Sequence, residues 1–181
     1  MNTLRNATGY LAGAIENDVQ GMCSWRDHIK NSLAHIGIRW MDPCQKPTSY
    51  GCETKETQAE LVRSRAHGNF SFVAKEMELI RAIDLRMIDL SDFVVVSYDP
   101  AITTTGTHEE ISYAIRQNKP VILWIVRGGM DAVPLWWFAE MRGCPVLDSV
   151  NGVIALLCTY DITSKDTLRV MSHNKWLLFD R

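Results

Sequence analysis

The sequence predicts an α/β fold: an open parallel sheet of about five strands with helices on both faces, of the Rossmann/flavodoxin-like class. Two observations predict it. The segments FVVVSYD (93–99) and PVILWIV (120–126) are almost continuously apolar, as expected for strands that are covered on both faces. Segments with apolar residues at helical spacing alternate with such runs along the chain, which is the pattern of successive strand–helix–strand units.

The composition predicts a single domain over residues 1–181. Hydrophobic residues make up 46% of the chain and charged residues 22%, which is ordinary for a soluble protein. The net charge of −2 gives no basic surface for nucleic acid, and no apolar run reaches the ~18 residues of a membrane span. We therefore expect a cytoplasmic protein with no nucleic-acid or membrane partner. The five cysteines form no C-x-x-C pair and the histidines show no ligand spacing, so neither a metal nor a cofactor is predicted.

The first part of the chain contains three predicted elements and a long polar excursion. The elements are a strand at 7–15, a helix at 24–37 and a strand at 38–43. Ser24 is the predicted N-cap of the helix, Gly37 its end, and Pro43 breaks the second strand. Apolar residues show little periodic spacing in residues 44–70, and we expect one helical turn there, around 57–65. A loop of this length in a compact domain is more often functional than idle.

The rest of the chain completes the alternation. A helix at 72–92 is predicted from an apolar stripe that includes Val73, Met77 and Ile80. The further elements are a strand at 93–99, a helix at 109–119, a strand at 120–126, a helix at 133–141, a strand at 144–149 and a helix at 150–157. The tail at 161–181 is ambiguous, although its segment KWLLFD has the composition of a strand.

The segment TTTGTHEEISYAI (103–115) places two adjacent glutamates at the start of a predicted helix. Thr107 and Glu110 fit a capping box, with Thr107 as the N-cap, and the positive end of the helix dipole should keep Glu110 ionised. A ligand role competes with this structural role, because open α/β sheets bind ligands beyond the carboxyl ends of their strands. The loops that leave this edge are at 13–21, 99–106 and 127–133. The residues alone leave both roles of Glu110 open.

Three segments have an order and spacing that are more specific than any one of them. They are YLAGAIE (10–16) with a Trp-Arg pair after it, the D-L-x-x-I-x-x-x-D segment DLRMIDLSDFVVV (84–96), and the G-x-x-x-E segment TTGTHEEISYAIRQNKPVILWI (104–125). Together they resemble the nucleoside 2-deoxyribosyltransferase family over about residues 10–125. The resemblance implies an enzyme that cleaves the N-glycosidic bond of a 2′-deoxynucleoside through a covalent deoxyribosyl-glutamate and transfers the sugar to another base.

The resemblance also implies roles for particular residues. Glu110 corresponds to the nucleophile, Asp84 to the aspartate that exchanges a proton with the base, and Tyr10 to a tyrosine that touches the nucleophile. The implied substrate-binding positions are Gly13, Ile15, Asp92, Thr104, Gly106 and Trp136. Other roles stay open on the residues alone: Asp84 as a solvated carboxylate beside the arginines of its helix, Asp92 as a turn or cap residue, and Tyr10 as part of the core.

Thr104 bears on the charge of the substrate. Transferases of the family carry an aspartate at this position, whereas the related 2′-deoxynucleoside 5′-phosphate N-hydrolases carry a hydroxyl residue, which suits phosphate. Against phosphate, the first loop has Ala14 and Glu16 where the hydrolases use Ser and Arg. We therefore place a transferase first, a monophosphate N-glycosidase second and a non-catalytic nucleotide-binding or sensing module third. The implied partners are deoxynucleosides or deoxynucleotides, free bases, and further copies of the chain, one of which completes the pocket near Trp136 in a homo-oligomer.

Overall fold

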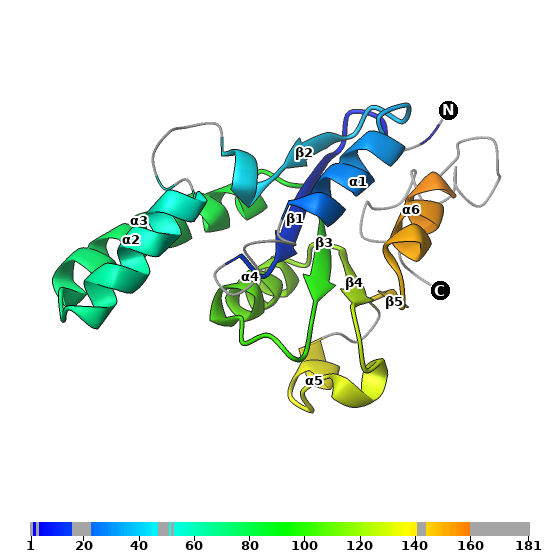
Figure 1. The fold of residues 1–181 in the computed structure, drawn as a ribbon. Coiled ribbons are helices and arrows are strands. Elements are labelled where there is room, and N and C mark those ends of the chain that lie inside the picture. Colours follow the sequence, from blue (N-terminus) through cyan, green and yellow to red (C-terminus); the bar gives the residue numbers. More distant parts are fainter. Residues whose placement is uncertain are drawn as a thin grey trace.

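The described strands form one parallel sheet in the order β2-β1-β3-β4-β5 (Figure 1). They are β1 (Thr8–Gly13), β2 (Arg39–Met41), β3 (Phe93–Tyr98), β4 (Val121–Ile125) and β5 (Val146–Leu147). The chain passes from β1 outward to β2 and then returns across β1 to β3. This is the flavodoxin-like order, whose topological switch point lies between β1 and β3. The predicted fold class is confirmed.

The structure is a computed structural model that describes residue 2 and residues 4–15, 23–46, 51, 53–140 and 144–159. The tail predicted at 161–181 lies outside the described residues, as do residues 47–50 and 52 of the polar excursion. A single domain over the whole chain stays a prediction.

The side chains of β1 and β3 enter two cores, one on each face of the sheet. Because successive strand residues point to opposite faces, Tyr10 and Val94 belong to one core and Leu11 and Val95 to the other. Both strands are buried along their whole length. This explains why their sequences are apolar throughout instead of alternating with polar residues.

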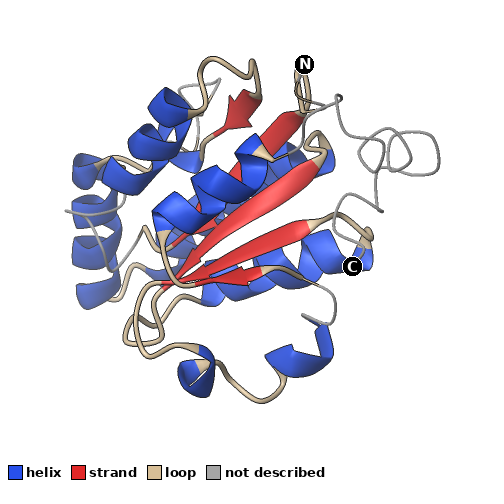
Figure 2. Ribbon diagram, turned by 90° about the vertical axis from the view of Figure 1, so that its right-hand side faces the viewer, coloured by secondary structure: helices blue, strands red, loops and turns tan. Residues whose placement is uncertain are grey.

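Helices cover both faces of the sheet (Figures 1 and 2). α1 (Ser24–Ser32) and α6 (Val150–Cys158) pack together on the Leu11 side. α3 (Phe70–Asp89) and α4 (Thr105–Arg116) pack together on the Tyr10 side, and α2 (Lys55–Ala66) lies against α3. Among the helices described, we find none that is both long enough and apolar enough to cross a lipid bilayer.

The polar excursion contains more helix than the sequence predicts. A single turn is predicted at 57–65, whereas α2 extends over twelve residues. Its buried residues are only Gln58 and Leu61, so it lacks the apolar stripe that reveals a helix in a sequence. With α3 it forms a pair of helices that extends away from the sheet (Figure 1).

Smaller differences concern helix ends. The remaining short elements are η1 (Pro43–Gln45), η2 (Met130–Ala132) and α5 (Trp137–Glu140). Of the helix predicted at 133–141, the described part of the chain forms only α5, and η2 lies before the predicted range. α1 begins at Ser24 with Cys23 at the N-cap position, so Ser24 is not the cap, and Gly37 (φ +82°) lies in the turn that follows the helix.

Candidate active site

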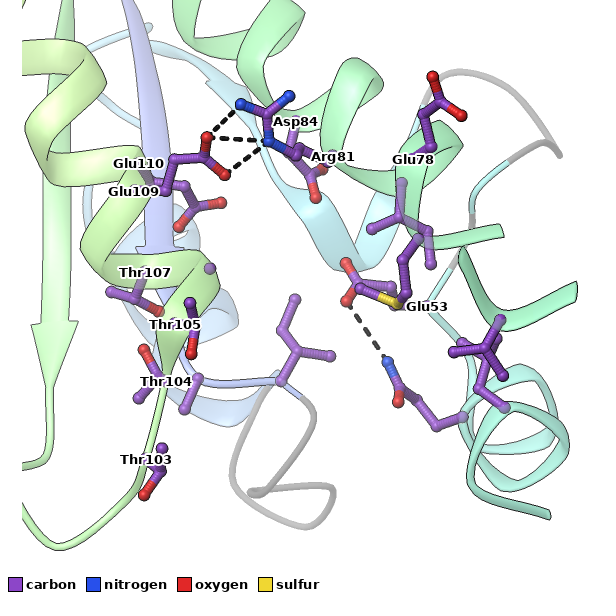
Figure 3. A pocket seen from close by; sticks show the side chains of 18 of the residues that line it. Glu53, Glu78, Arg81, Asp84, Thr103, Thr104, Thr105, Thr107, Glu109 and Glu110 are labelled. Atoms are coloured by element: carbon purple, nitrogen blue, oxygen red, sulfur yellow. Dashed lines mark hydrogen bonds and ion pairs between the residues drawn. The ribbon is translucent and has the colours of Figure 1, made fainter. Parts of the chain in front are cut away.

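A pocket of about 500 Å³ lies at the carboxyl ends of β1 and β3, at the switch point of the sheet (Figure 3). Residues 13–15, at the end of β1, form one side of it, and residues 103–107, which lead into α4, form the next. The helices α2 and α3 form the remaining wall, with Gln58, Leu61, Met77, Ile80, Arg81 and Asp84 among its residues. The volume is that of a site for a small molecule.

Glu110 lies on the face of α4 that packs against the sheet. The buried residues of this helix are Thr107, Glu110, Ile111 and Ala114, which share one face because they are spaced three and four residues apart. A carboxylate therefore occupies a position for which packing alone favours an apolar side chain. Glu110 also lines the pocket, so its carboxyl group lies between the core and the cavity.

The capping box predicted for Thr107 and Glu110 is wrong. α4 begins at Thr105, with Thr104 at the N-cap position and no capping bond from its side chain. Glu110 is therefore in the second turn, and its Oε1 accepts a 2.5 Å hydrogen bond from the hydroxyl of Tyr10. Helix capping does not account for this carboxylate.

Tyr10 joins the central strand to the helix that carries Glu110. Its ring is fully buried in the core between β1 and α4. Burial raises the pKa of Tyr10 well above its ordinary value, and the charges of Glu110 and Asp84 raise it further. The hydroxyl therefore stays protonated over the physiological range and remains a hydrogen-bond donor to Glu110.

The pKa of Glu110 is raised to about 8, chiefly by burial and then by the charge of Asp84, while the hydrogen bond from Tyr10 lowers it. At neutral pH Glu110 is thus largely in its protonated form. The expectation that the helix dipole keeps Glu110 ionised is wrong. The dipole contributes only about 0.3–1 kcal/mol and falls off within the first turn, so desolvation outweighs it in the second.

Asp84 lies on the buried side of α3, together with Ile80 and Ile88. Its Oδ1 is 2.9 Å from Nζ of Lys46, whose side chain is also buried. Burial raises the pKa of Asp84 to about 7, Lys46 opposes this rise and Glu53 adds to it. A solvated helix carboxylate is therefore the wrong description. A carboxyl group that titrates near neutrality can both give and accept a proton.

Glu109 has the opposite environment to its neighbour Glu110. It is partly exposed at the pocket wall, where Nε of Arg81 donates to its two carboxylate oxygens at 2.8 and 2.7 Å (Figure 3). The hydrogen bonds from Arg81 lower the pKa of Glu109. The other arginine of α3, Arg86, pairs with Asp89 at 3.6 Å, so each arginine of this helix has a carboxylate partner other than Asp84.

Four of the implied substrate-binding residues line the pocket: Gly13, Ile15, Thr104 and Gly106. A Cβ atom on Gly13 would lie 3.1 Å from the carbonyl oxygen of Ser97, so glycine permits the close packing of β1 on β3. A Cβ atom on Gly106 would meet nothing within 4 Å, so this glycine faces open space. The hydroxyl of Thr104 is buried and has no hydrogen-bond partner among the described residues.

The structure places Asp92 and Trp136 elsewhere. Asp92 lies at the amino end of β3, where its Oδ2 accepts a 2.9 Å hydrogen bond from the amide of Thr8. It thus joins two strands at the edge opposite the pocket, and a substrate-binding role for Asp92 is wrong. Trp136 precedes α5 and is 80% exposed. Completion of the pocket at Trp136 by a second copy stays a prediction.

Two buried cations near these carboxyl groups, Arg26 and Lys46, were not predicted from the sequence. Arg26 is fully buried, and its guanidinium donates to the carbonyl oxygens of Leu11 (3.2 Å) and Gly13 (3.0 Å), which supports the end of β1. It also lowers the pKa of Glu110 and of Asp84. The Trp-Arg pair after YLAGAIE is the signal that could have found it. In the described ranges, no three His, Cys, Asp or Glu side chains are grouped so that they could hold a metal ion.

No known protein family matches the chain in sequence, and no curated protein is significantly similar to it. Solved structures do match. A conserved protein from Enterococcus faecalis V583 is 14% identical, with a TM-score of 0.55 over 85% of this chain and 98% of its own. A 2-deoxyribosyltransferase from Bacillus psychrosaccharolyticus is 21% identical, with a TM-score of 0.50 over 87% and 94% of the two chains. A CMP N-glycosidase from Clostridium botulinum is 14% identical, with a TM-score of 0.46 over 84% and 99%.

The family resemblance of the sequence is thus confirmed at the level of the fold. The order of the sheet, the pocket at its switch point and the similarity to the Enterococcus and Bacillus proteins agree with one another. The chain has the fold of a 2-deoxyribosyltransferase.

Proposed function

We propose that the protein cleaves the N-glycosidic bond of a 2′-deoxynucleoside through a covalent deoxyribosyl-Glu110 intermediate and transfers the sugar to another base. The observation that carries this proposal is the pairing of two buried carboxyl groups, Glu110 and Asp84, on adjacent helices that line one pocket. The shared fold with a 2-deoxyribosyltransferase supports it.

Two carboxyl groups with different surroundings suit two different tasks. Bond cleavage at C1′ passes through a state with oxocarbenium character, and an ionised Glu110 can attack this carbon to form the glycosyl-enzyme. Protonated Asp84 gives its proton to the departing base and recovers one from the incoming base. The form of the site that can react thus carries one proton on this pair of carboxyl groups, on Asp84. The hydroxyl of Tyr10 stabilises the carboxylate of Glu110 by a hydrogen bond.

The alternative function is hydrolysis of a 2′-deoxynucleoside 5′-monophosphate. The buried hydroxyl of Thr104, which lies at the N-cap position of α4, favours it, because a helix N-terminus and a hydroxyl group both bind phosphate. The charge of the pocket favours nucleosides. The carboxyl groups that line it are those of Glu53, Glu78, Asp84, Glu109 and Glu110, whereas its lining cations are Arg65 and Arg81. Glu16, which would add to the repulsion, lies outside the described residues.

We expect deoxynucleosides to be processed in preference to their 5′-monophosphates, because an excess of carboxyl groups repels a dianion. Deoxyadenosine, deoxycytidine and their monophosphates are incubated with and without a second free base, and the products are separated by chromatography. A new nucleoside shows transfer, and free sugar shows hydrolysis. Thr104→Val is the matched variant: it replaces the hydroxyl by a methyl group of similar size and should leave nucleoside turnover unchanged.

A preference of the wild-type protein for monophosphates that Thr104→Val abolishes would place the hydrolase first. The third alternative, a binding or sensing module without turnover, predicts that none of these substrates releases its base. The presence of two buried carboxyl groups in the pocket argues against that alternative, since a protein that only binds has no need for a nucleophile and an acid.

We also infer that the protein forms a homo-oligomer. Leu135 and Trp136 are 89% and 80% exposed beside the partly exposed Phe138, and such a group of large apolar side chains marks a contact surface. Sedimentation velocity should therefore show a species of at least twice the chain mass of 20.6 kDa. A monomer at micromolar concentration would contradict the inference.

A further inference from the structure

Lys46 is buried, although lysine is almost never fully buried unless it is paired. It follows η1, at the start of the polar excursion. Its ammonium group has three oxygen partners: the carbonyl of Gly51 at 2.7 Å, Oε2 of Glu53 at 3.3 Å and Oδ1 of Asp84 at 2.9 Å. The contacts with Gly51 and Glu53 are hydrogen bonds, and the contact with Asp84 is an ion pair between two buried groups.

The three partners come from two different parts of the chain. Gly51 and Glu53 precede α2, whereas Asp84 belongs to α3. Gly51 also packs closely on α3, because a Cβ atom at this position would lie 2.8 Å from Cδ1 of Ile83. The lysine thus ties the segment before α2 to the helix that carries the candidate acid, and glycine allows the approach.

The cluster contains one cation for two carboxyl groups. With Glu53 and Asp84 both ionised, these three groups together carry a net negative charge in a buried place. With one proton on Asp84 the three groups are neutral together, which is the state that the departing base requires. The other groups that act on Asp84 are Arg26 of α1 and, through their mutual interaction, Glu110 of α4.

We propose that Lys46 is a positioning residue of the pocket, whose buried ammonium group, shared between Asp84 and Glu53, holds the Asp84 carboxyl in place and governs when it carries a proton. Its consequence for turnover rests on the proposed function. Its consequence for the titration of Asp84 does not, and the two can be measured separately.

The first experiment measures the titration of the Asp84 carboxyl by ¹³C NMR in the full-length protein without substrate, with Asp84→Asn to assign the signal. In Lys46→Met the titration should move upward by about 1–3 pH units, because the neighbouring cation that favours the ionised form is gone. Lys119→Met is the matched control. The ammonium of Lys119 also has three oxygen partners, but all are backbone carbonyls, those of Ile88, Asp89 (2.8 Å) and Ser91 (2.7 Å), and it lies at the opposite edge of the sheet, before β4.

The second variant, Glu53→Gln, gives the opposite sign and leaves the buried lysine paired with Asp84. Without the competing carboxylate, the titration of Asp84 should move downward by about one unit. An unchanged Asp84 titration in Glu53→Gln, or in a folded Lys46→Met, would overturn the proposal, as would an equal shift in Lys119→Met.

Turnover then separates this proposal from the proposed function. If deoxynucleosides are cleaved, the alkaline limb of the pH–rate profile should move upward in Lys46→Met, where the pKa of Asp84 rises past that of Glu110. In Glu53→Gln the acid limb should move downward instead, because the pKa of Asp84 then lies further below that of Glu110. Shifts in the titration without any base release would support the role of Lys46 and contradict the proposed function. Base release with an unmoved titration would do the reverse.

Discussion

Glu110→Gln is expected to fold normally and to lose about 10⁴–10⁶-fold in turnover, because glutamine keeps the shape of the side chain but cannot attack C1′. The measurement is base release from a deoxynucleoside under single-turnover conditions. Glu109→Gln is the matched control: the neighbouring glutamate pairs with Arg81 at the pocket wall, and its loss should leave most of the activity. Substantial activity in Glu110→Gln, or loss in Glu109→Gln alone, would show that the nucleophile is assigned to the wrong residue.

The stability of Glu110→Gln provides an independent check on the environment of this side chain. The folded-state pKa of about 8 lies above the ordinary value of 4.5, so the folded protein binds more protons than the unfolded chain between these values. The contribution of Glu110 to stability is therefore present at low pH and is lost as the pH rises towards 8. Glutamine does not ionise, so the Tm of Glu110→Gln should match that of the wild type near pH 5 and exceed it near pH 8.5. At the higher pH the free energy of unfolding of the variant should be larger by on the order of 1–3 kcal/mol.

Asp84→Asn is expected to lose about 10²–10⁴-fold in turnover, because asparagine cannot supply the proton that the departing base needs. Asp89→Asn, a change on the exposed side of the same helix, is the matched control and should stay active. Asp84 is buried and paired with Lys46, so its replacement is not a surface substitution and thermal unfolding should accompany the assay. Undiminished turnover in a folded Asp84→Asn would remove Asp84 from the proposed mechanism.

The pH–rate profile separates loss of the acid from a general loss of structure. Activity requires Glu110 ionised and Asp84 protonated. Because the pKa of Glu110 lies above that of Asp84, this is the less populated of the two singly protonated forms, and activity falls below the lower pKa and above the higher one. With values of about 8 and about 7, the wild-type profile should be a narrow bell with its maximum between them. Asp84→Asn should lose the alkaline limb. Its remaining acid limb should report the pKa of Glu110 alone and lie below about 8, because the charge of Asp84 raises that pKa.

The fold was readable from the sequence because its central strands are covered on both faces. A continuous apolar run such as 93–96, bounded by Asp92 and Ser97, is typical of a strand in the middle of a parallel sheet. α2 was not readable, since it buries only Gln58 and Leu61 and is held by contact with α3 rather than by an apolar stripe of its own. The spacing of apolar residues in a sequence shows which face of a helix is buried, so a helix that buries few apolar residues leaves no such pattern.

The candidate site was partly readable for a related reason. Glu110 and Asp84 each lie on the buried stripe of their helix, where an acidic residue signals something other than packing. The start of α4 was misjudged, because a run of threonines offers several possible N-caps and local sequence does not choose among them. The contact of Lys46 with Asp84 could not be predicted, because it depends on how a segment without regularly spaced apolar residues packs on α3.

The central claim is that Glu110 forms a covalent bond with the sugar, and trapping this adduct tests it most directly. A 2′-fluoro-2′-deoxynucleoside, whose fluorine destabilises the oxocarbenium-like state, is incubated with the protein, which is then digested and analysed by peptide mass spectrometry. We predict a fluorodeoxyribosyl adduct on Glu110 in the wild-type protein and in Glu109→Gln, and none in Glu110→Gln. An adduct on Glu109, or consumption of deoxynucleoside by a protein in which Glu110 is never labelled, would contradict the account.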